Sequence, residues 1–199
     1  EGASGLRLTA DATNTPFSVT AVAENTAITS GNALPTVNGD YVLTIPELPS
    51  GSVFNGMIST GSLSVVALPT VAGQGLNLTA QNGDLVVVES LNIGSGSMVL
   101  GAKNGGIALG GQVTANTLDA TVRDDLTLNS DINSLAADFT GAGNLTVNQA
   151  SLGTLNISEL DLAGGDVLLN VAGDVVIESL TGSGGDLVIN TQGSVTFGD

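Results

Sequence analysis

The residues of this sequence that could do chemistry are almost all carboxylates. Asp and Glu together number 19, Lys and Arg number three, and His and Cys are absent. Nucleophilic catalysis by a Ser–His or Cys–His pair is therefore excluded. A Ser–Lys pair would need Lys103, the single lysine, which we interpret as a solvated turn residue. The formal net charge of −16 also argues against binding to nucleic acid or to an acidic membrane through a basic patch.

Paired carboxylates are the remaining catalytic possibility. Asp124 and Asp125 are adjacent, and Asp119 lies nearby in the sequence. Pectin-degrading enzymes with parallel β-helix folds use acidic residues on one outer face. They also use basic residues to hold an acidic polysaccharide and aromatic residues to hold sugar rings, and this chain has only 3% aromatic residues. We therefore expect no enzymatic activity, and a polysaccharide-active β-helix enzyme is the minor alternative.

Calcium is the ligand that the carboxylates suggest. Gly164-Gly165-Asp166 recurs one repeat later as Gly184-Gly185-Asp186. If each repeat forms one coil of a stack, the two aspartates lie about 5 Å apart, and a hard cation would relieve their repulsion. Alternatively, each Asp bonds the backbone of its own turn. The tandem G-G-x-G-x-D spacing of calcium-binding repeats is missing, which favours the turn interpretation. We expect no cofactor, with calcium at Asp166 and Asp186 left open.

The elements that would position these residues come from an internal repeat. From about residue 75, a Gly, Asn or Asp cluster precedes an apolar–variable–apolar triplet. The first members of the triplets are Leu85, Ile107, Leu126, Leu145, Val175 and Val195, and the third members are Val87, Leu109, Leu128, Val147, Ile177 and Phe197. Period-two alternation predicts short strands with one buried face. We therefore expect each set of six to form one inward stack.

The spacing of the triplets predicts coils of about 20 residues, a period that is typical of solenoids. The steps between first members are 22, 19, 19, 30 and 20, and we attribute the step of 30 to an insertion or an extra short strand within 148–166. A second strand precedes some of the triplets, at 76–78, 98–100, 167–169 and 187–189. Because stacked coils pair their strands and bury their inward residues, the pattern predicts an all-β parallel β-helix, or β-solenoid. A β-sandwich is the structural alternative.

The span 1–74 differs from the rest of the chain. All five prolines lie in 1–74, whereas 75–199 carries the regular coils. We expect the solenoid to start in 1–74 and to be interrupted by a loop or hairpin within 31–60, around residues 41–45; a small separate β-module is the alternative. The span 31–60 holds the single tyrosine, Tyr41, with Phe54 and Met57. Since aromatic anchors carry much binding energy, we predict partner binding through these three residues. A cover for an open end of the solenoid is the other interpretation of this span.

The regular part resembles the repeat shaft of filamentous-haemagglutinin-like exoproteins, which are large bacterial adhesins of the two-partner secretion type. The resemblance rests on 75–199, in particular on residues 76–85 and on the turn Lys103-Asn104-Gly105-Gly106 with its following triplet. The Asn-Pro-Asn motifs of the secretion domain are missing. The resemblance implies a right-handed β-helix, display at the cell surface and a role in attachment.

Two functions follow as expectations. The first is a secreted, rigid segment of a surface adhesin that mediates or supports attachment to a receptor or glycan on a host or neighbouring cell. The second is a filament subunit that stacks end to end on other copies of itself. We interpret the sequence, which starts at Glu1, as a mature or excised piece of something longer. No apolar run approaches the ~20 residues of a transmembrane helix, so we expect no membrane insertion.

Overall fold

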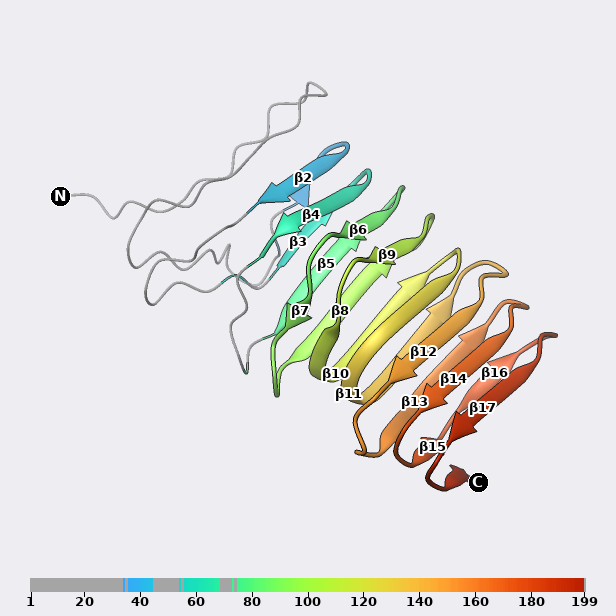
Figure 1. The fold of residues 1–199 in the computed structure, drawn as a ribbon. Coiled ribbons are helices and arrows are strands. Elements are labelled where there is room, and N and C mark those ends of the chain that lie inside the picture. Colours follow the sequence, from blue (N-terminus) through green and yellow to red (C-terminus); the bar gives the residue numbers. More distant parts are fainter. Residues whose placement is uncertain are drawn as a thin grey trace.

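The computed structural model describes residues 34, 36–44, 54, 56–68, 73 and 75–198. Within these residues the regular elements are all β-strands, and every strand pairing is parallel. The strands lie in successive coils that follow one another from the N-terminal to the C-terminal end of the stack (Figure 1). The expected parallel β-solenoid is therefore confirmed, and the antiparallel sandwich is excluded. Right-handedness stays a prediction.

One side of the solenoid is a ladder of eight strands, which we call ladder A. Each strand pairs with the strand at the equivalent place in the next coil. The strands are β2 (Tyr41–Thr44), β4 (Leu63–Ala67), β6 (Leu85–Val87), β9 (Ile107–Leu109), the first part of β11 (Leu126–Phe139), β12 (Leu145–Gln149), β14 (Val167–Val171) and β17 (Leu187–Thr191). Their first residues follow at steps of 22, 22, 22, 19, 19, 22 and 20, so the coil length is nearly constant along the whole ladder.

The facing side is a second set of parallel strands, which we call ladder B. It contains β1 (Thr36–Val37), β3 (Gly56–Ser59), β5 (Leu76–Ala80), β8 (Ser97–Ala102), β10 (Val113–Val122), the second part of β11, β13 (Leu155–Leu162), β15 (Val175–Ile177), β16 (Leu180–Gly182) and β18 (Val195–Phe197). The short strand β7 (Leu91–Asn92) pairs with the start of β10 at the corner that leads from ladder A to ladder B. We call this place the third corner. It holds residues 91–92, 113–115 and 130–132 in successive coils.

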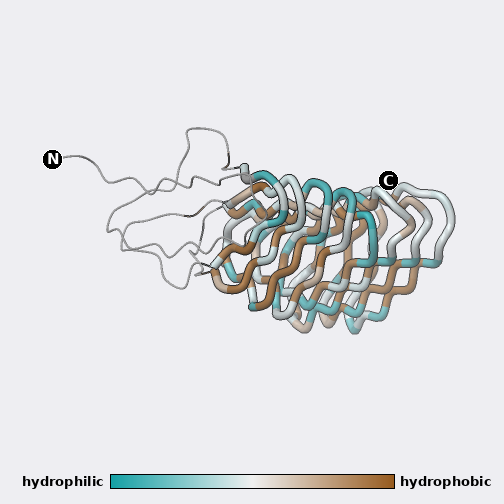
Figure 2. Tube along the Cα trace, turned by 90° about the horizontal axis from the view of Figure 1, so that it is seen from above, coloured by the Kyte–Doolittle hydropathy of each residue, from teal (hydrophilic) through white to brown (hydrophobic). Residues whose placement is uncertain are grey.

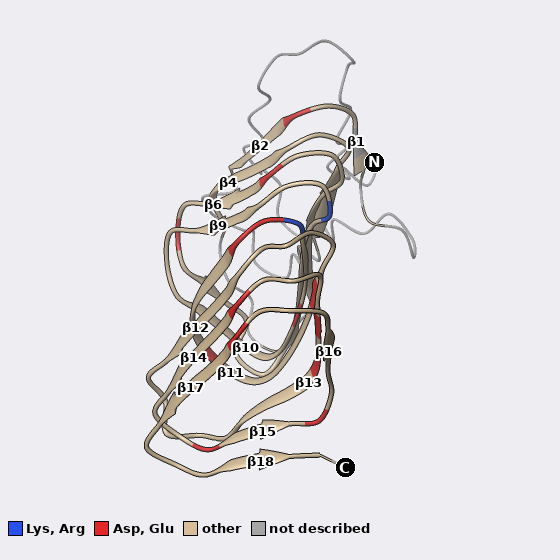
Figure 3. Cartoon of the chain, turned by 90° about the vertical axis from the view of Figure 1, so that its right-hand side faces the viewer, with Lys and Arg blue, Asp and Glu red and all other residues tan. Residues whose placement is uncertain are grey.

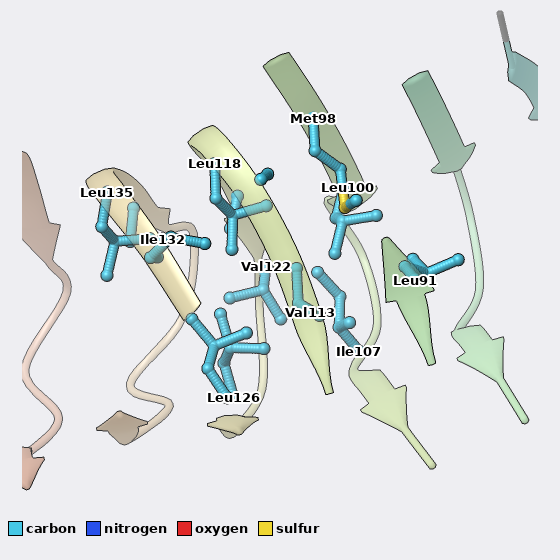
Figure 4. Packing of buried hydrophobic residues seen from close by; sticks show 14 of the residues in the cluster. Leu91, Met98, Leu100, Ile107, Val113, Leu118, Val122, Leu126, Ile132 and Leu135 are labelled. Atoms are coloured by element: carbon cyan, nitrogen blue, oxygen red, sulfur yellow. The ribbon is translucent and has the colours of Figure 1, made fainter. Parts of the chain in front are cut away.

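The core lies between the two ladders because alternate residues of each strand point inward. Leu126 and Leu128 are fully buried, whereas Thr127 between them is exposed. Figure 4 shows the side chains of ladder A, the third corner and ladder B meeting in the interior, and Figure 2 shows apolar segments recurring at equivalent places in successive coils. Polar residues that are buried in the described part are Ser59, Ser130 and Gln149.

The expected inward stacks are confirmed in four coils and wrong in two. Leu85, Ile107, Leu126 and Leu145 stack in ladder A, as predicted. Val175 and Val195 stack on Leu155 in ladder B instead, with Ile177 and Phe197 beside them. The ladder A positions in these coils belong to Val167 and Leu187. The step of 30 arises because Val175 lies in ladder B, with the strand β13 between Leu145 and Val167 in the sequence. The same triplet motif occurs on both sides of a coil, so the motif alone does not say to which ladder a strand belongs.

The coils also begin earlier than the repeat motif indicates. β2 at Tyr41–Thr44 pairs in parallel with β4, and β3 pairs with β5. The residues around 41–45 that were expected to form a loop or hairpin therefore provide a coil strand as far as Thr44. Strand pairing crosses the expected boundary at 74/75. None of the described residues forms a helix long and apolar enough to cross a membrane.

Candidate functional site

Five carboxamide side chains occupy successive coils at one position on the outside of the solenoid, where ladder A reaches the third corner. We call them the amide row: Gln112, Asn129, Asn148, Asn170 and Asn190. Asn129, Asn148, Asn170 and Asn190 are direct partners in the strand register. Gln112 precedes Val113, which pairs with Ser130, so Gln112 lies beside Asn129. The row follows from the sequence because each Asn comes directly after an apolar–variable–apolar triplet of ladder A.

Four members of the amide row are hydrogen-bonded along the stack. Asn148 Nδ2 donates to Asn129 Oδ1 at 3.2 Å, Asn170 Nδ2 to Asn148 Oδ1 at 2.9 Å, and Asn190 Nδ2 to Asn170 Oδ1 at 2.8 Å. A primary amide has two donor hydrogens and an acceptor oxygen with two lone pairs. Asn148 and Asn170 therefore each keep one donor and one acceptor site for solvent or a ligand.

A hollow of about 340 Å³ lies along the amide row. It is lined by Gln112, Asn129, Ser130, Asn148, Gln149, Ala150 and Asn170. The lining contains amides, one hydroxyl and one methyl group, and no ionisable side chain. The hollow is therefore uncharged, in a chain whose formal net charge is −16.

The floor of the hollow contains two buried polar residues, Ser130 and Gln149, which are 1% and 2% exposed. Gln149 Oε1 accepts hydrogen bonds from the backbone N–H of Ile132 at 3.2 Å and from Ser130 Oγ at 3.3 Å. The bond to the backbone N–H fixes Oε1 as the acceptor and hence Nε2 as the donor. Gln149 Nε2 is buried and donates to no atom of the described residues. A buried donor without a partner costs free energy, so it marks a place where an acceptor is missing.

Asp166 and Asp186, the predicted calcium ligands, lie one coil apart, as expected from the pairing of Val167 with Leu187. Asp166 Oδ1 accepts the backbone N–H of Asp186 at 2.8 Å. The carboxylate therefore bonds the turn of the next coil. No group of three or more His, Cys, Asp or Glu residues that could hold a metal is found in the described part. Calcium binding stays a prediction. A rise in Tm on addition of calcium would support it if the Asp186→Asn substitution abolishes that rise.

The bond between Asp166 and Asp186 belongs to a column of similar bonds. At the residue before most ladder A strands, a side-chain oxygen accepts the equivalent backbone N–H of the next coil. Such bonds run from Ser62 N to Asp40 Oδ1, from Gly106 N to Asp84 Oδ1, from Asn144 N to Asp125 Oδ1, and from Asp166 N to Asn144 Oδ1, all between 2.8 and 2.9 Å. These turn side chains link neighbouring coils in addition to the backbone ladder.

Tyr41, Phe54 and Met57, the predicted partner anchors, all lie in the core. They are 5%, 5% and 0% exposed. Tyr41 stacks on Leu63 in ladder A, and burial raises the pKa of its phenol. Their placement argues against the prediction that they present a surface to a partner. Proline-rich composition suggested an insertion here, but apolar residues at these three positions instead fill the first described coils.

The structure does not bring the predicted acidic pair together with a third carboxylate. Asp119 faces outward from β10, beside Val99 and Ala136 of the neighbouring coils. Asp124 and Asp125 lie in the turn that follows, where Asp125 Oδ1 accepts both the backbone N–H and Nδ2 of Asn144. Lys103 is exposed in a turn, and the register places it one coil from Arg123 (Figure 3).

No match to this chain is found among protein-family models, curated proteins or solved structures. The resemblance to filamentous-haemagglutinin-like adhesins therefore stays a prediction. The amide row was not recognised from the sequence, although it has a signal there: an Asn directly after the triplet at 126–128, 145–147, 167–169 and 187–189.

Proposed function

We propose that this chain is a non-enzymatic, rigid β-solenoid segment of an extracellular bacterial adhesin, and that it supports attachment of one cell to another surface. The observation that carries the proposal is the continuous stack of eight strands in ladder A. Seven coil steps of about 4.8 Å give a rise of about 34 Å along one side. At most coil steps, side-chain hydrogen bonds in the turns add to the backbone hydrogen bonds of the ladder. Neighbouring coils are therefore joined by both kinds of bond. Such a stack serves as a spacer because it holds its ends at a fixed distance.

An attachment assay tests this function. Beads coated with the full chain would be applied to bacterial and epithelial cell layers under shear, and we expect them to be retained better than beads coated with albumin. The matched control is the Leu126→Asp variant, which places a charge in the core and should unfold the stack. Retention that is no better than that of albumin on every cell layer would contradict an adhesive role.

A second candidate function is end-to-end assembly of copies of this chain through the face of its last described coil. Phe197 is 59% exposed, Leu180 41% and Val195 39%, although the equivalent residues of earlier coils are buried. This apolar face and its strand edges could receive a further coil, either of a longer chain or of a second copy. Electron microscopy and sedimentation at rising protein concentration would show filaments. If Phe197→Asp leaves the sedimentation coefficient unchanged at every concentration, this face makes no contact between copies.

A further inference from the structure

The amide row offers a regular set of free hydrogen-bonding groups. Its members are spaced by the coil step of about 4.8 Å. Within the hollow, Asn148 and Asn170 each keep one donor and one acceptor after the bonds along the row are made. A ligand that lies along the row therefore needs donors and acceptors that recur at a similar interval. The hydroxyl groups of successive sugar rings in a polysaccharide meet this requirement, since each hydroxyl both donates and accepts.

The floor of the hollow adds a requirement for an acceptor. Gln149 is 2% exposed, its Oε1 is held by Ile132 N–H and Ser130 Oγ, and its Nε2 has no partner among the described residues. Gln149 lines the hollow together with Asn148 and Ala150. Gln149 thus supplies an observation that is independent of the amide row and that points to an oxygen-bearing ligand.

The charge of the site disfavours anionic ligands. The lining holds no Lys or Arg that could pair with a carboxylate or sulfate group. The formal net charge of −16 repels anions at longer range. An apolar ligand is also disfavoured, because it would cover the free amide groups without replacing their hydrogen bonds with water. An extended peptide fits less well because its strand rise of about 3.3 Å does not match the coil step.

We propose that the amide row and the hollow beside it bind a neutral, hydroxyl-rich polysaccharide. The chain lies along the stack, with its hydroxyl groups bonded to Asn129, Asn148 and Asn170 and one oxygen directed to Gln149 Nε2. The inference names the partner class for the proposed attachment and therefore rests on that function. It also moves the binding surface from 31–60 to the regular coils.

Affinity gel electrophoresis of the full chain tests the proposal. The gels would contain hydroxyethyl cellulose, laminarin or yeast mannan as neutral probes and polygalacturonate as the anionic control. We expect at least one neutral probe to retard the wild-type chain and polygalacturonate to have no effect. Asn148→Ala should weaken binding by about tenfold, since it removes direct hydrogen bonds to the ligand. Ala150→Glu should abolish binding, because it fills the hollow and adds a charge without removing a bond of the row.

The matched control is Asn190→Ala, which removes an amide of the same row outside the hollow. It should lower the thermal stability less than Asn148→Ala, because Asn190 makes one bond of the row and Asn148 makes two, and it should leave the affinity unchanged. The proposal is overturned if no neutral probe retards the wild-type chain, if Asn190→Ala and Asn148→Ala lose affinity equally, or if Ala150→Glu binds as before.

The outcome is separable from that of the attachment assay. Beads that attach to cells while no neutral polysaccharide retards the chain would leave the adhesive function standing and remove the ligand assignment. Retardation by a polysaccharide without attachment to any cell layer would support the ligand assignment and contradict the adhesive function. A crystal structure with an enclosed water on Gln149 Nε2, and no density in the hollow after soaking with the probe's oligosaccharide, would also overturn the assignment.

Discussion

Ladder A and the third corner are built from the same residue types, yet they differ in regularity. From β6 to β17, ladder A keeps one register without a shift. At the third corner the register is lost between β11 and the next coil, and in ladder B it shifts between Leu135 and Ala136. The hollow and the buried Gln149 both lie where this regularity ends.

The cause of the difference is the length of neighbouring coils. Ser130 pairs with Gln149, and Ser134 pairs with Asn156. Between these two pairs the chain advances by four residues in β11 and by seven residues in the next coil. The three additional residues of the longer coil are accommodated in a loop at 150–154, which is not paired with β11. Ile132 loses the carbonyl partner that a coil of equal length would supply, and Gln149 Oε1 takes its place. A uniform repeat builds a rod, whereas this change in coil length coincides with an uncharged hollow on its surface.

Core truncation in ladder A should have the largest effect. Leu126→Ala should lower the free energy of unfolding by about 2–5 kcal/mol, because Leu126 is fully buried between Ile107 and Leu145. Thr127→Ala, on the outside of the same strand, should cost less than about 0.5 kcal/mol. Urea unfolding of both variants measures the contrast. Equal costs would mean that the register assigned to this strand is wrong.

Close contact between turns should have the next largest effect. A Cβ at Gly165 would overlap the backbone carbonyl of Gly143 in the preceding coil. Gly165→Ala should therefore cost about 1–3 kcal/mol through local displacement of one turn from the other. Gly153 in the loop at 150–154 has no atom within 4 Å of the equivalent Cβ position, so Gly153→Ala should be nearly neutral. Thermal unfolding compares the two, and a similar loss at Gly153 would show that the loop is packed as tightly as the turns.

The buried glutamine should contribute to stability through its oxygen. Gln149→Leu removes the acceptor of the buried Ile132 N–H, and it should cost about 1–3 kcal/mol despite the added apolar group. Gln112→Leu, in the exposed amide row, provides the control and should be nearly neutral. The hydrogen-exchange rate of the Ile132 amide should rise in Gln149→Leu only. A stability equal to that of the wild type would show that the coil mismatch is relieved without Gln149.

Much of this fold could be predicted from the sequence, because the two periodicities that create it are local. Alternation in Leu126-Thr127-Leu128 indicates a strand, and recurrence of such triplets at a nearly constant interval indicates stacked coils. The assignment of strands to ladders could not be read in the same way. Val167 and Val175 both begin an apolar–variable–apolar triplet after a turn, and only the strand register places the first in ladder A and the second in ladder B.

The candidate site could not be predicted from the sequence for a related reason. Gln149 is an inward member of β12, whereas Asn148 beside it is an outward amide. Its burial follows from its place in the alternation of β12, and its unpaired Nε2 follows from the difference in length between two coils. For Tyr41 the difference is the opposite one. An aromatic residue in an irregular stretch of sequence indicated an exposed anchor, whereas the structure buries Tyr41 beside Leu63.

The smallest expected effect concerns Asp174, in the turn before β15 on the less regular side. Its Oδ1 accepts hydrogen bonds from the backbone N–H of Ser194 at 2.7 Å and from the Ser194 hydroxyl at 2.8 Å. These bonds lower the pKa of Asp174 below its ordinary value of 3.8, and the backbone bond has the larger effect. A lowered folded-state pKa gives stability that is present above the ordinary value and is lost as the pH falls through the folded value. The contribution is small because the side chain is exposed. Titration by NMR should give Asp174 a lower pKa in the wild type than in Ser194→Ala, and the stability difference between the two proteins should shrink below about pH 4. An unchanged Asp174 pKa in Ser194→Ala would show that the bond from the Ser194 hydroxyl does not contribute to the lowered pKa.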